Sequence, residues 1–182
     1  DAIPLTFMTQ ASGGALAERM RIDGSGNVGI GTSTVGSGGS NTQNVQIHNS
    51  TANSTYLKLS TSGTGATASD GLDLIIGNDG TGYLWNRENA STIFATNNTE
   101  RMRIDSNGHL IPGASNTYDL GSQAKPWKDL YIGDLKLSNE TREEGNDIDG
   151  TKGNWTIQEG ESNLYIINNN NGKKYRFALE EV

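Results

Sequence analysis

The chain has 182 residues, a formal net charge of −7 and no cysteine. The length fits one domain or two small ones, the acidic balance disfavours nucleic acid as a partner, and the lack of cysteine excludes a disulfide framework, a thiolate zinc site and a cysteine nucleophile. Gly, Asn, Thr and Ser number 78, whereas Leu, Ile, Val and Phe number 35. A chain so poor in core-forming residues either stays loose or buries its apolar groups against copies of itself.

The chain contains an internal repeat that predicts strands in both copies. The sequence Glu-Arg-Met-Arg-Ile-Asp occupies residues 18–23 and again residues 100–105. A short apolar segment precedes each copy, and a Gly/Asn turn with a second apolar segment follows it. These segments are 6–9 and 28–31 in the first copy, and 93–96 and 109–113 in the second. Strand, turn, strand, turn and strand is the pattern of a small β-meander.

Side chains alternate along the central strand of each copy. Because neighbouring side chains of a strand point to opposite faces, the Met and Ile residues are expected to face a core. The arginines are expected on a solvated face, with salt bridges between subunits as the alternative. The expected core residues are Met20, Ile22, Met102 and Ile104, and the arginines are Arg19, Arg21, Arg101 and Arg103.

Four more strands are predicted between the two copies. They comprise residues 44–48, 55–59, 72–76 and 82–86. The last two strands are separated by a segment that contains Asp79-Gly80, a strong hairpin signal because both residues tolerate a positive φ.

The C-terminal third differs in composition, and two of the three Trp residues lie there. Pro126 can begin a helical turn, which would place Trp127, Leu130 and Tyr131 on one face. A strand at 134–137 and a polar, charged loop at 139–154 follow.

The terminus is predicted to be a hairpin. Its strands comprise residues 163–167 and 173–179, and Asn171-Gly172 provides the turn. The residues Tyr175, Phe177 and Leu179 are expected to share one face with Trp155 and Ile157 of a preceding strand.

No catalytic, metal or cofactor site is predicted. His48 and His109 are isolated, so zinc chemistry is not expected. Residues 23–27 and 146–150 resemble the start of a calcium loop, but the Gly and Glu at later positions are missing, so both are interpreted as turns. The carboxylates of 140–149 are interpreted as a solvated loop rather than the facing pair that a glycosidase needs.

Aromatic side chains are the remaining binding candidates. The residues expected to stack on a sugar ring of a receptor are Tyr83, Trp85, Trp155 and Tyr165, because amphipathic rings occur at binding surfaces. The alternative for each is packing within the core or between subunits.

Two motifs resemble those of bacteriophage tail fibres and tail spikes. The first is the repeat, which in its fuller form runs from residue 18 to Asn27-Val28-Gly29-Ile30-Gly31. The second runs from Asp119-Leu120-Gly121-Ser122 to Trp127-Lys128-Asp129-Leu130-Tyr131 and resembles a distal region of such fibres. The second copy of the repeat departs from the pattern at residues 109–112.

The resemblance implies an elongated homotrimer whose C-terminal part contacts the host surface. We therefore expect an all-β fold, with a homotrimeric, β-meander or β-prism-like shaft over residues 1–113 and repeats near 5–31 and 92–113. A compact β domain, residues 114–182, would form the distal end. Trimerisation also accounts for the composition, since three chains can bury one shared apolar seam. Many such fibres end in a self-cleaving helical chaperone, and no such tail is expected here.

The expected function is attachment of the virion to a host cell by binding a bacterial surface glycan, without catalysis. The protein would then be extracellular, in a virion tail, with other tail proteins as partners and no nucleic-acid partner or membrane insertion. A purely structural trimerisation or connector segment is the first alternative. A glycan-degrading tail spike is the second.

Overall fold

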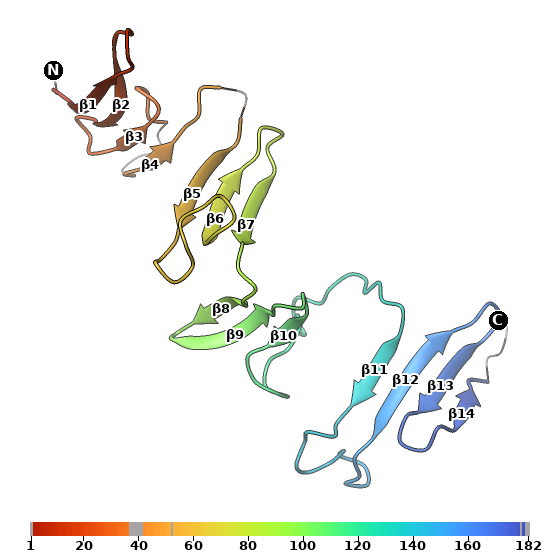
Figure 1. The fold of residues 1–182 in the computed structure, drawn as a ribbon. Helices are drawn as coiled ribbons and strands as arrows, with labels where there is room; N and C mark the ends of the chain where they lie inside the picture. Colours follow the sequence, from red (N-terminus) through yellow and green to blue (C-terminus); the bar gives the residue numbers. More distant parts are fainter. Residues whose placement is uncertain (1, 37–41, 52, 179, 181–182) are drawn as a thin grey trace. The chain divides into compact units, whose positions relative to one another are not determined.

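A computed structural model describes residues 2–36, 42–51, 53–178 and 180 (Figure 1). Within them, fourteen strands form four open sheets, and no helix occurs. The all-β prediction is confirmed. No helix of the described residues is long and apolar enough to cross a membrane.

The first sheet contains the first copy of the repeat. Its strands, in spatial order, are β1 (Leu5–Gln10), β2 (Leu16–Ile22), β3 (Val28–Ile30) and β4 (Val45–Ile47). The first three form an antiparallel meander, and β4 pairs parallel to β3. The register of β1 and β2 shifts between Phe7 and Met8. This β-bulge locally changes the alternation of side chains on β2.

The second copy forms the sheet β8 (Thr92–Thr96), β9 (Thr99–Ile104) and β10 (Leu110–Pro112). The two copies share their tertiary details. Arg19 Nε donates to Thr9 Oγ1 over 2.9 Å, and Arg101 Nε donates to Thr96 Oγ1 over 2.8 Å. The first hairpin loop is longer than the second, which turns on Asn97 and Asn98 alone. The predicted meander therefore occurs in both copies, with the same arginine contact across hairpins of different length.

An aspartate caps the second turn of each meander. Asp23 Oδ1 accepts the backbone N–H groups of Ser25 and Asn27, each at 2.9 Å. Asp105 Oδ1 accepts those of Asn107 and His109, also at 2.9 Å. Such Asx contacts satisfy backbone donors that the sheet leaves unpaired. The interpretation of residues 23–27 as a turn agrees with these contacts.

The second arginine of each copy, Arg21 or Arg103, forms an ion pair within its own strand. Arg21 Nε lies 2.6 Å from Glu18 Oε1, and Arg103 Nη2 lies 2.5 Å from Glu100 Oε2. Both pairs are intrachain contacts, unlike the intersubunit salt bridges considered from the sequence. Hydrogen bonding to the arginine keeps the pKa of Glu18, and likewise of Glu100, below its usual value.

A third sheet comprises β5 (Thr55–Leu59), β6 (Leu72–Ile76) and β7 (Gly82–Asn86), all antiparallel. The predicted turn between β6 and β7 forms, with Gly80 at φ +84° and Asp79 Oδ1 accepting the N–H of Thr81. One face of this sheet carries only aliphatic side chains along its centre. Cross-strand pairing places Leu57, Leu74 and Leu84 in one row on that face.

The C-terminal sheet is a four-stranded meander. Its strands are β11 (Leu135–Ser138), β12 (Asn154–Glu159), β13 (Leu164–Asn168) and β14 (Lys174–Arg176), each antiparallel to the next. The terminal hairpin is confirmed, and the rings of Trp155 and Tyr175 lie 6.0 Å apart. Leu179, expected on the same face, lies outside the described residues.

The helical turn expected from Pro126 does not form. Residues 126–134 have no regular hydrogen-bonded structure, and the nearest feature is an isolated bridge between Ser122 and Lys125. Gly121, at φ +86°, directly precedes that bridge. Trp127 and Tyr131 are 67% and 92% exposed. A helical turn needs successive i→i+4 hydrogen bonds and a surface to pack on, and the single chain offers neither here.

Very little of the single chain is buried. Ile75 is the one large apolar residue of the described chain with less than a tenth of its surface exposed. Met20 and Ile22 are half-buried, and Met102 and Ile104 are 40% and 43% exposed. These four side chains are therefore partly exposed in the single chain, since no second layer of the described residues covers the sheets that carry them.

The chain divides into two compact units, residues 1–92 and 93–182. The change of composition along the sequence instead predicts a domain boundary between residues 113 and 114. The second unit includes the second copy of the repeat, because Arg101 contacts the segment that follows it. The guanidinium of Arg101 lies 5.2 Å from the ring centre of Tyr118, and Nη1 donates to the Tyr118 hydroxyl over 3.1 Å.

Candidate functional site

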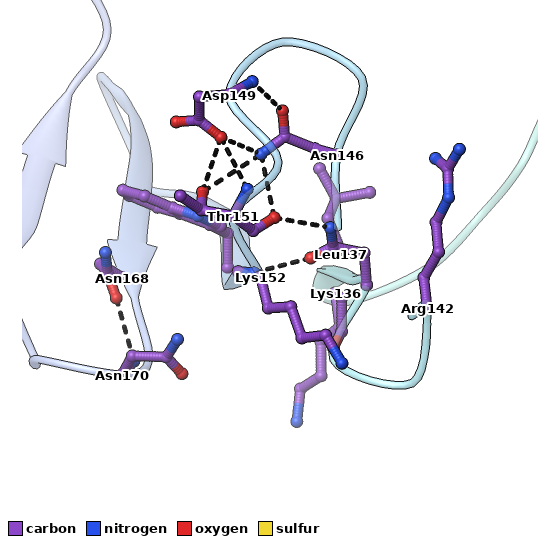
Figure 2. Close-up of a pocket in the computed structure, with 13 residues that line it drawn as sticks. Lys136, Leu137, Arg142, Asn146, Asp149, Thr151, Lys152, Asn168 and Asn170 are labelled. Carbon is purple, nitrogen blue, oxygen red and sulfur yellow. Dashed lines mark hydrogen bonds between the residues drawn. The ribbon is translucent and has the colours of Figure 1, made fainter. Parts of the chain in front are cut away.

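The loop between β11 and β12 forms one side of a polar pocket in the second unit (Figure 2). The cavity volume is about 680 Å³. Its lining consists of amide and hydroxyl side chains, three cationic side chains, one carboxylate, Leu137 and the indole of Trp155. Of the aromatic residues predicted to bind a ligand, Trp155 is the one that lines this pocket.

Two asparagines hold the loop together. The Asn139 side chain bridges its two ends, since Nδ2 donates to the Thr151 carbonyl over 3.1 Å and Oδ1 accepts the Gly153 N–H at 2.6 Å. Asn146 Oδ1 accepts the N–H groups of Ile148 and Asp149. These side chains replace the ladder bonds that a loop lacks, so the pocket wall has a defined backbone.

Gly145 allows the loop to fold tightly. It has φ +71°, and a Cβ atom there would lie 2.1 Å from the Gly150 carbonyl oxygen. Any other residue would clash with the backbone and also adopt a conformation that L side chains rarely take. The close approach of Gly145 to Gly150 thus depends on glycine.

Asp149 is the carboxylate in the pocket lining, and hydrogen bonds occupy one of its oxygens. Oδ1 accepts the hydroxyl of Thr151 at 2.7 Å, the N–H of Thr151 at 3.0 Å and the Asn146 amide at 2.5 Å. The hydrogen bonds from Thr151, followed by that from Asn146, hold the pKa of Asp149 below its usual value. Figure 2 shows this cluster around one end of the pocket.

The three cations of the lining differ in their partners. Arg142 forms ion pairs with Asp147 at 2.7 Å and Glu144 at 3.7 Å. Lys136 and Lys152, by contrast, form no ion pair or side-chain hydrogen bond with the rest of the described chain. Both are exposed. In Figure 2 their side chains extend away from the Asn146–Asp149 cluster.

Trp155 forms the apolar part of the lining together with Leu137, its cross-strand partner on β11. The indole lies close to Gly153, since a Cβ atom on that glycine would be 3.0 Å from Nε1. Gly153 therefore leaves room for the indole at the point where the loop enters β12.

Tyr165 lies on the other face of the same sheet. It pairs with Gln158 and Arg176, whose side chains alternate with those of Ile157 and Tyr175. Trp155 shares the face of Ile157, so Trp155 and Tyr165 do not belong to one site.

Tyr83 and Trp85 form a pair on β7 in the first unit. Their rings lie 6.0 Å apart, and the guanidinium of Arg87 stacks 4.2 Å from the centre of the Trp85 ring. They line a shallow pocket of about 400 Å³ with Tyr56. The four predicted aromatic residues are thus distributed over three surfaces: the Tyr83–Trp85 pair, Trp155 and Tyr165.

The polar residues of the pocket were not identified as binding residues from the sequence. The segment 146–150 was noted only for its likeness to a calcium loop. In the structure, Asn146 and Asp149 direct oxygens to hydrogen-bond donors of their own loop, and no group of three or more His, Cys, Asp and Glu residues suited to a metal occurs among the described residues. His109 contacts Asp105 at 3.2 Å, and His48 is exposed.

Comparisons with family models, curated proteins and solved structures found no significant match.

Proposed function

We propose that the chain is part of a bacteriophage tail fibre or tail spike and attaches the virion to a bacterial surface glycan without catalysis. The observation that carries this proposal is the pocket beside Trp155. Sugar hydroxyls both donate and accept hydrogen bonds, so they suit a lining of amide and hydroxyl groups. The apolar faces of sugar rings suit an indole. Together with the resemblance to tail-fibre repeats, this lining favours a glycan as ligand.

We also propose that three copies of the chain associate, with residues 1–113 forming a prism-like shaft. The support is the bare aliphatic face of the β5–β6–β7 sheet. Leu57, Leu74 and Leu84 are 44%, 50% and 48% exposed in the single chain. Leu59 and Ile76 on the same face are 57% and 48% exposed. A contiguous apolar face of this kind favours contact with another protein surface. In a homotrimer each chain contributes the same face to that contact.

A structural connector is the second candidate. The exposed apolar faces favour it, because they would be needed for trimerisation whether or not the chain binds a receptor. In that case the receptor site would lie in another protein or another part of the fibre.

A glycan-degrading spike has less support. Glycoside hydrolysis by the common mechanisms needs two carboxyl groups placed on either side of the scissile bond. The pocket lining holds one, Asp149, which is engaged with Thr151 and Asn146.

The test is binding of the purified chain to an array of bacterial surface polysaccharides. Wild type is compared with Trp155→Ala and with Asn170→Ala, whose side chain lines the pocket without a hydrogen bond among the described contacts. We expect binding to at least one polysaccharide and about tenfold weaker binding in each variant, which corresponds to about 1.4 kcal/mol. The Asn170→Ala variant provides an independent test of the same pocket in case Trp155→Ala does not fold. Trimers that bind no polysaccharide would favour the connector, and release of reducing ends would favour the spike.

A further inference from the structure

We propose that a second saccharide site lies on the β5–β6–β7 sheet, on the face opposite the aliphatic one, and that this site takes neutral sugars. The residues of this aromatic face are Tyr56, Lys58, Asp73, Ile75, Tyr83 and Trp85. The inference goes beyond the proposed function, because the aromatic face belongs to the first unit and its pocket shares no residue with the pocket beside Trp155.

Cross-strand pairing brings three rings to the aromatic face. Ile75 on β6 pairs with Tyr56 on β5 and with Tyr83 on β7, so the two tyrosines flank it in one row. Trp85 lies on the same face as Tyr83, because side chains two positions apart on a strand share a face. All three rings line the pocket of about 400 Å³, a volume in the range of small-molecule sites.

The aromatic face is packed beneath its rings without help from another chain. Ile75 is the one large apolar side chain buried among the described residues. Asp73, also buried, pairs with Arg87, whose guanidinium lies 4.2 Å from the centre of the Trp85 ring. Trp85 therefore packs against a side chain that an ion pair already holds in place. A surface ordered before binding loses less conformational entropy when a ligand binds.

Polar groups around the rings are available to a ligand. Four side chains of the pocket lining form no hydrogen bond with the described residues: Ser54, Tyr56, Asn78 and Tyr83. Three of them carry hydroxyls and the fourth an amide, and these groups both donate and accept hydrogen bonds, as sugar hydroxyls do. The apolar face of a sugar ring packs on aromatic rings. Rings with unpaired polar groups beside them therefore favour a saccharide.

The charge of the pocket favours a neutral sugar over an anionic one. Asp79 is the one charged residue of the lining. Its two oxygens accept hydrogen bonds from the backbone N–H and the hydroxyl of Thr81, which stabilise the β6–β7 turn and the ionised carboxylate. An anionic ligand would be repelled by this carboxylate, and no cation of the lining would offset the repulsion.

The two faces of the sheet suit different partners. The aliphatic face presents Leu57, Leu74 and Leu84 without polar groups, so it suits another protein surface. The aromatic face is partly covered by the chain itself, since Lys58 Nζ donates to the Asp70 carbonyl of the β5–β6 loop at 2.5 Å. Assembly through the aliphatic face would leave the aromatic face accessible to a ligand.

The experiment measures binding by the full chain that carries Trp155→Ala, so that the other pocket does not contribute. Isothermal titration calorimetry compares dextran, mannan and galactan fragments as neutral probes with polygalacturonate as the anionic probe and choline as the cationic one. We expect at least one neutral polymer to bind at least about tenfold more tightly than polygalacturonate, because like charges oppose binding.

Variants made in the Trp155→Ala chain assign this binding to the aromatic face. Tyr83→Ala should weaken it about tenfold through loss of a ring, and Asn78→Ala about threefold through loss of one hydrogen bond. Asn78 is exposed in a turn, so its variant keeps the test valid if Tyr83→Ala does not fold. Tyr131→Ala, exposed and outside both pockets, is the control and should leave binding unchanged. Unchanged binding in both pocket variants, or an equal loss in the control, would contradict the assignment.

The outcomes separate this inference from the proposed function. Wild-type binding of polysaccharide that disappears in Trp155→Ala overturns the second site and leaves the proposed function supported. Binding that persists in Trp155→Ala and falls in Asn78→Ala supports the second site. Failure to bind any polysaccharide overturns both. A preference for polygalacturonate or choline overturns the inference, and so does loss of the trimer in Tyr83→Ala by light scattering, which would identify the face as a contact between copies.

Discussion

Asp73 on β6 is buried beside two cationic side chains, although the single chain buries almost no apolar residues. Its side chain is 0% exposed, and its oxygens lie 2.9 Å from Arg87 Nε and 3.0 Å from Lys58 Nζ. Burial raises the pKa of Asp73, but the hydrogen bonds and charges of Arg87 and Lys58 outweigh it and hold that pKa below its usual value. The carboxylate therefore links β6 to β5 and to the residue that follows β7 through charge rather than through apolar packing.

The lowered pKa of Asp73 predicts acid sensitivity. The unfolded state takes up the proton first as the pH falls, so the contribution of Asp73 to the free energy of unfolding is present above about pH 4 and is lost as the pH drops toward the folded-state pKa. Asp73→Asn should be less stable than wild type at neutral pH and lose less stability in acid. Urea unfolding across the acidic range measures this. Asp129→Asn, in an exposed pair with Lys128, should change neither quantity, and an equal response of the two variants would contradict the prediction.

Gly145 is the second residue whose identity the local structure requires. Gly145→Ala should lower the free energy of unfolding by about 2–4 kcal/mol through clash and a strained φ, and it should weaken glycan binding. Gly172 has φ +73° but nothing within 4 Å of its added Cβ, so Gly172→Ala should cost only about 1 kcal/mol. Urea unfolding and binding compare the two, and equal costs would show that the close approach to Gly150 is unimportant.

The meanders show how an element depends on its turns. The β8–β9 hairpin turns on Asn97 and Asn98, both with positive φ at 49° and 56°. Such a conformation suits a two-residue hairpin whose twist matches its strands. The corresponding loop of the first copy is longer, so the repeat preserves the strands and varies the connection.

This geometry predicts different responses at two asparagines of the second copy. Asn98→Ala should cost about 1 kcal/mol because alanine disfavours a positive φ, and Asn98→Gly should be neutral or slightly stabilising. Asn107→Ala is the control, since Asn107 contributes its backbone N–H to Asp105 rather than a side-chain bond. Thermal unfolding of the variants measures the costs. A loss in Asn107→Ala equal to that in Asn98→Ala would argue against φ as the cause.

For the whole molecule, the exposed apolar faces lead to the proposed trimer. Their exposure in every sheet means that stability should depend on chain concentration, because burial between chains removes apolar area from water.

The Leu74→Asp variant tests that proposal, because its charge would lie in the middle of the aliphatic face. We expect wild type to scatter light as a trimer at micromolar concentration and Leu74→Asp as a monomer, since an unpaired buried charge is costly. Ile148→Asp, at a position already 95% exposed in a loop, is the matched control and should remain trimeric. A monomeric wild type would contradict the arrangement.

Strands and turns were largely predictable because their signals are local. The meander around residues 18–23, the Asp79-Gly80 hairpin and the face shared by Trp155 and Tyr175 follow from alternation and from residues that tolerate positive φ. The helical turn expected after Pro126 was wrong because its signal was also only local. A favourable first residue does not supply the hydrogen bonds or the packing surface that a helical turn needs.

The amino-acid sequence by itself determined the all-β class and the duplicated meander, because each depends on neighbours a few residues apart. Only the tertiary structure decided that Asn139 bridges the two ends of its loop, that Lys136 and Lys152 line one pocket with Trp155, and that Tyr165 lies on the opposite face from Trp155. Those relations join residues up to 19 positions apart, and they depend on sheet register and loop closure, which no local pattern encodes.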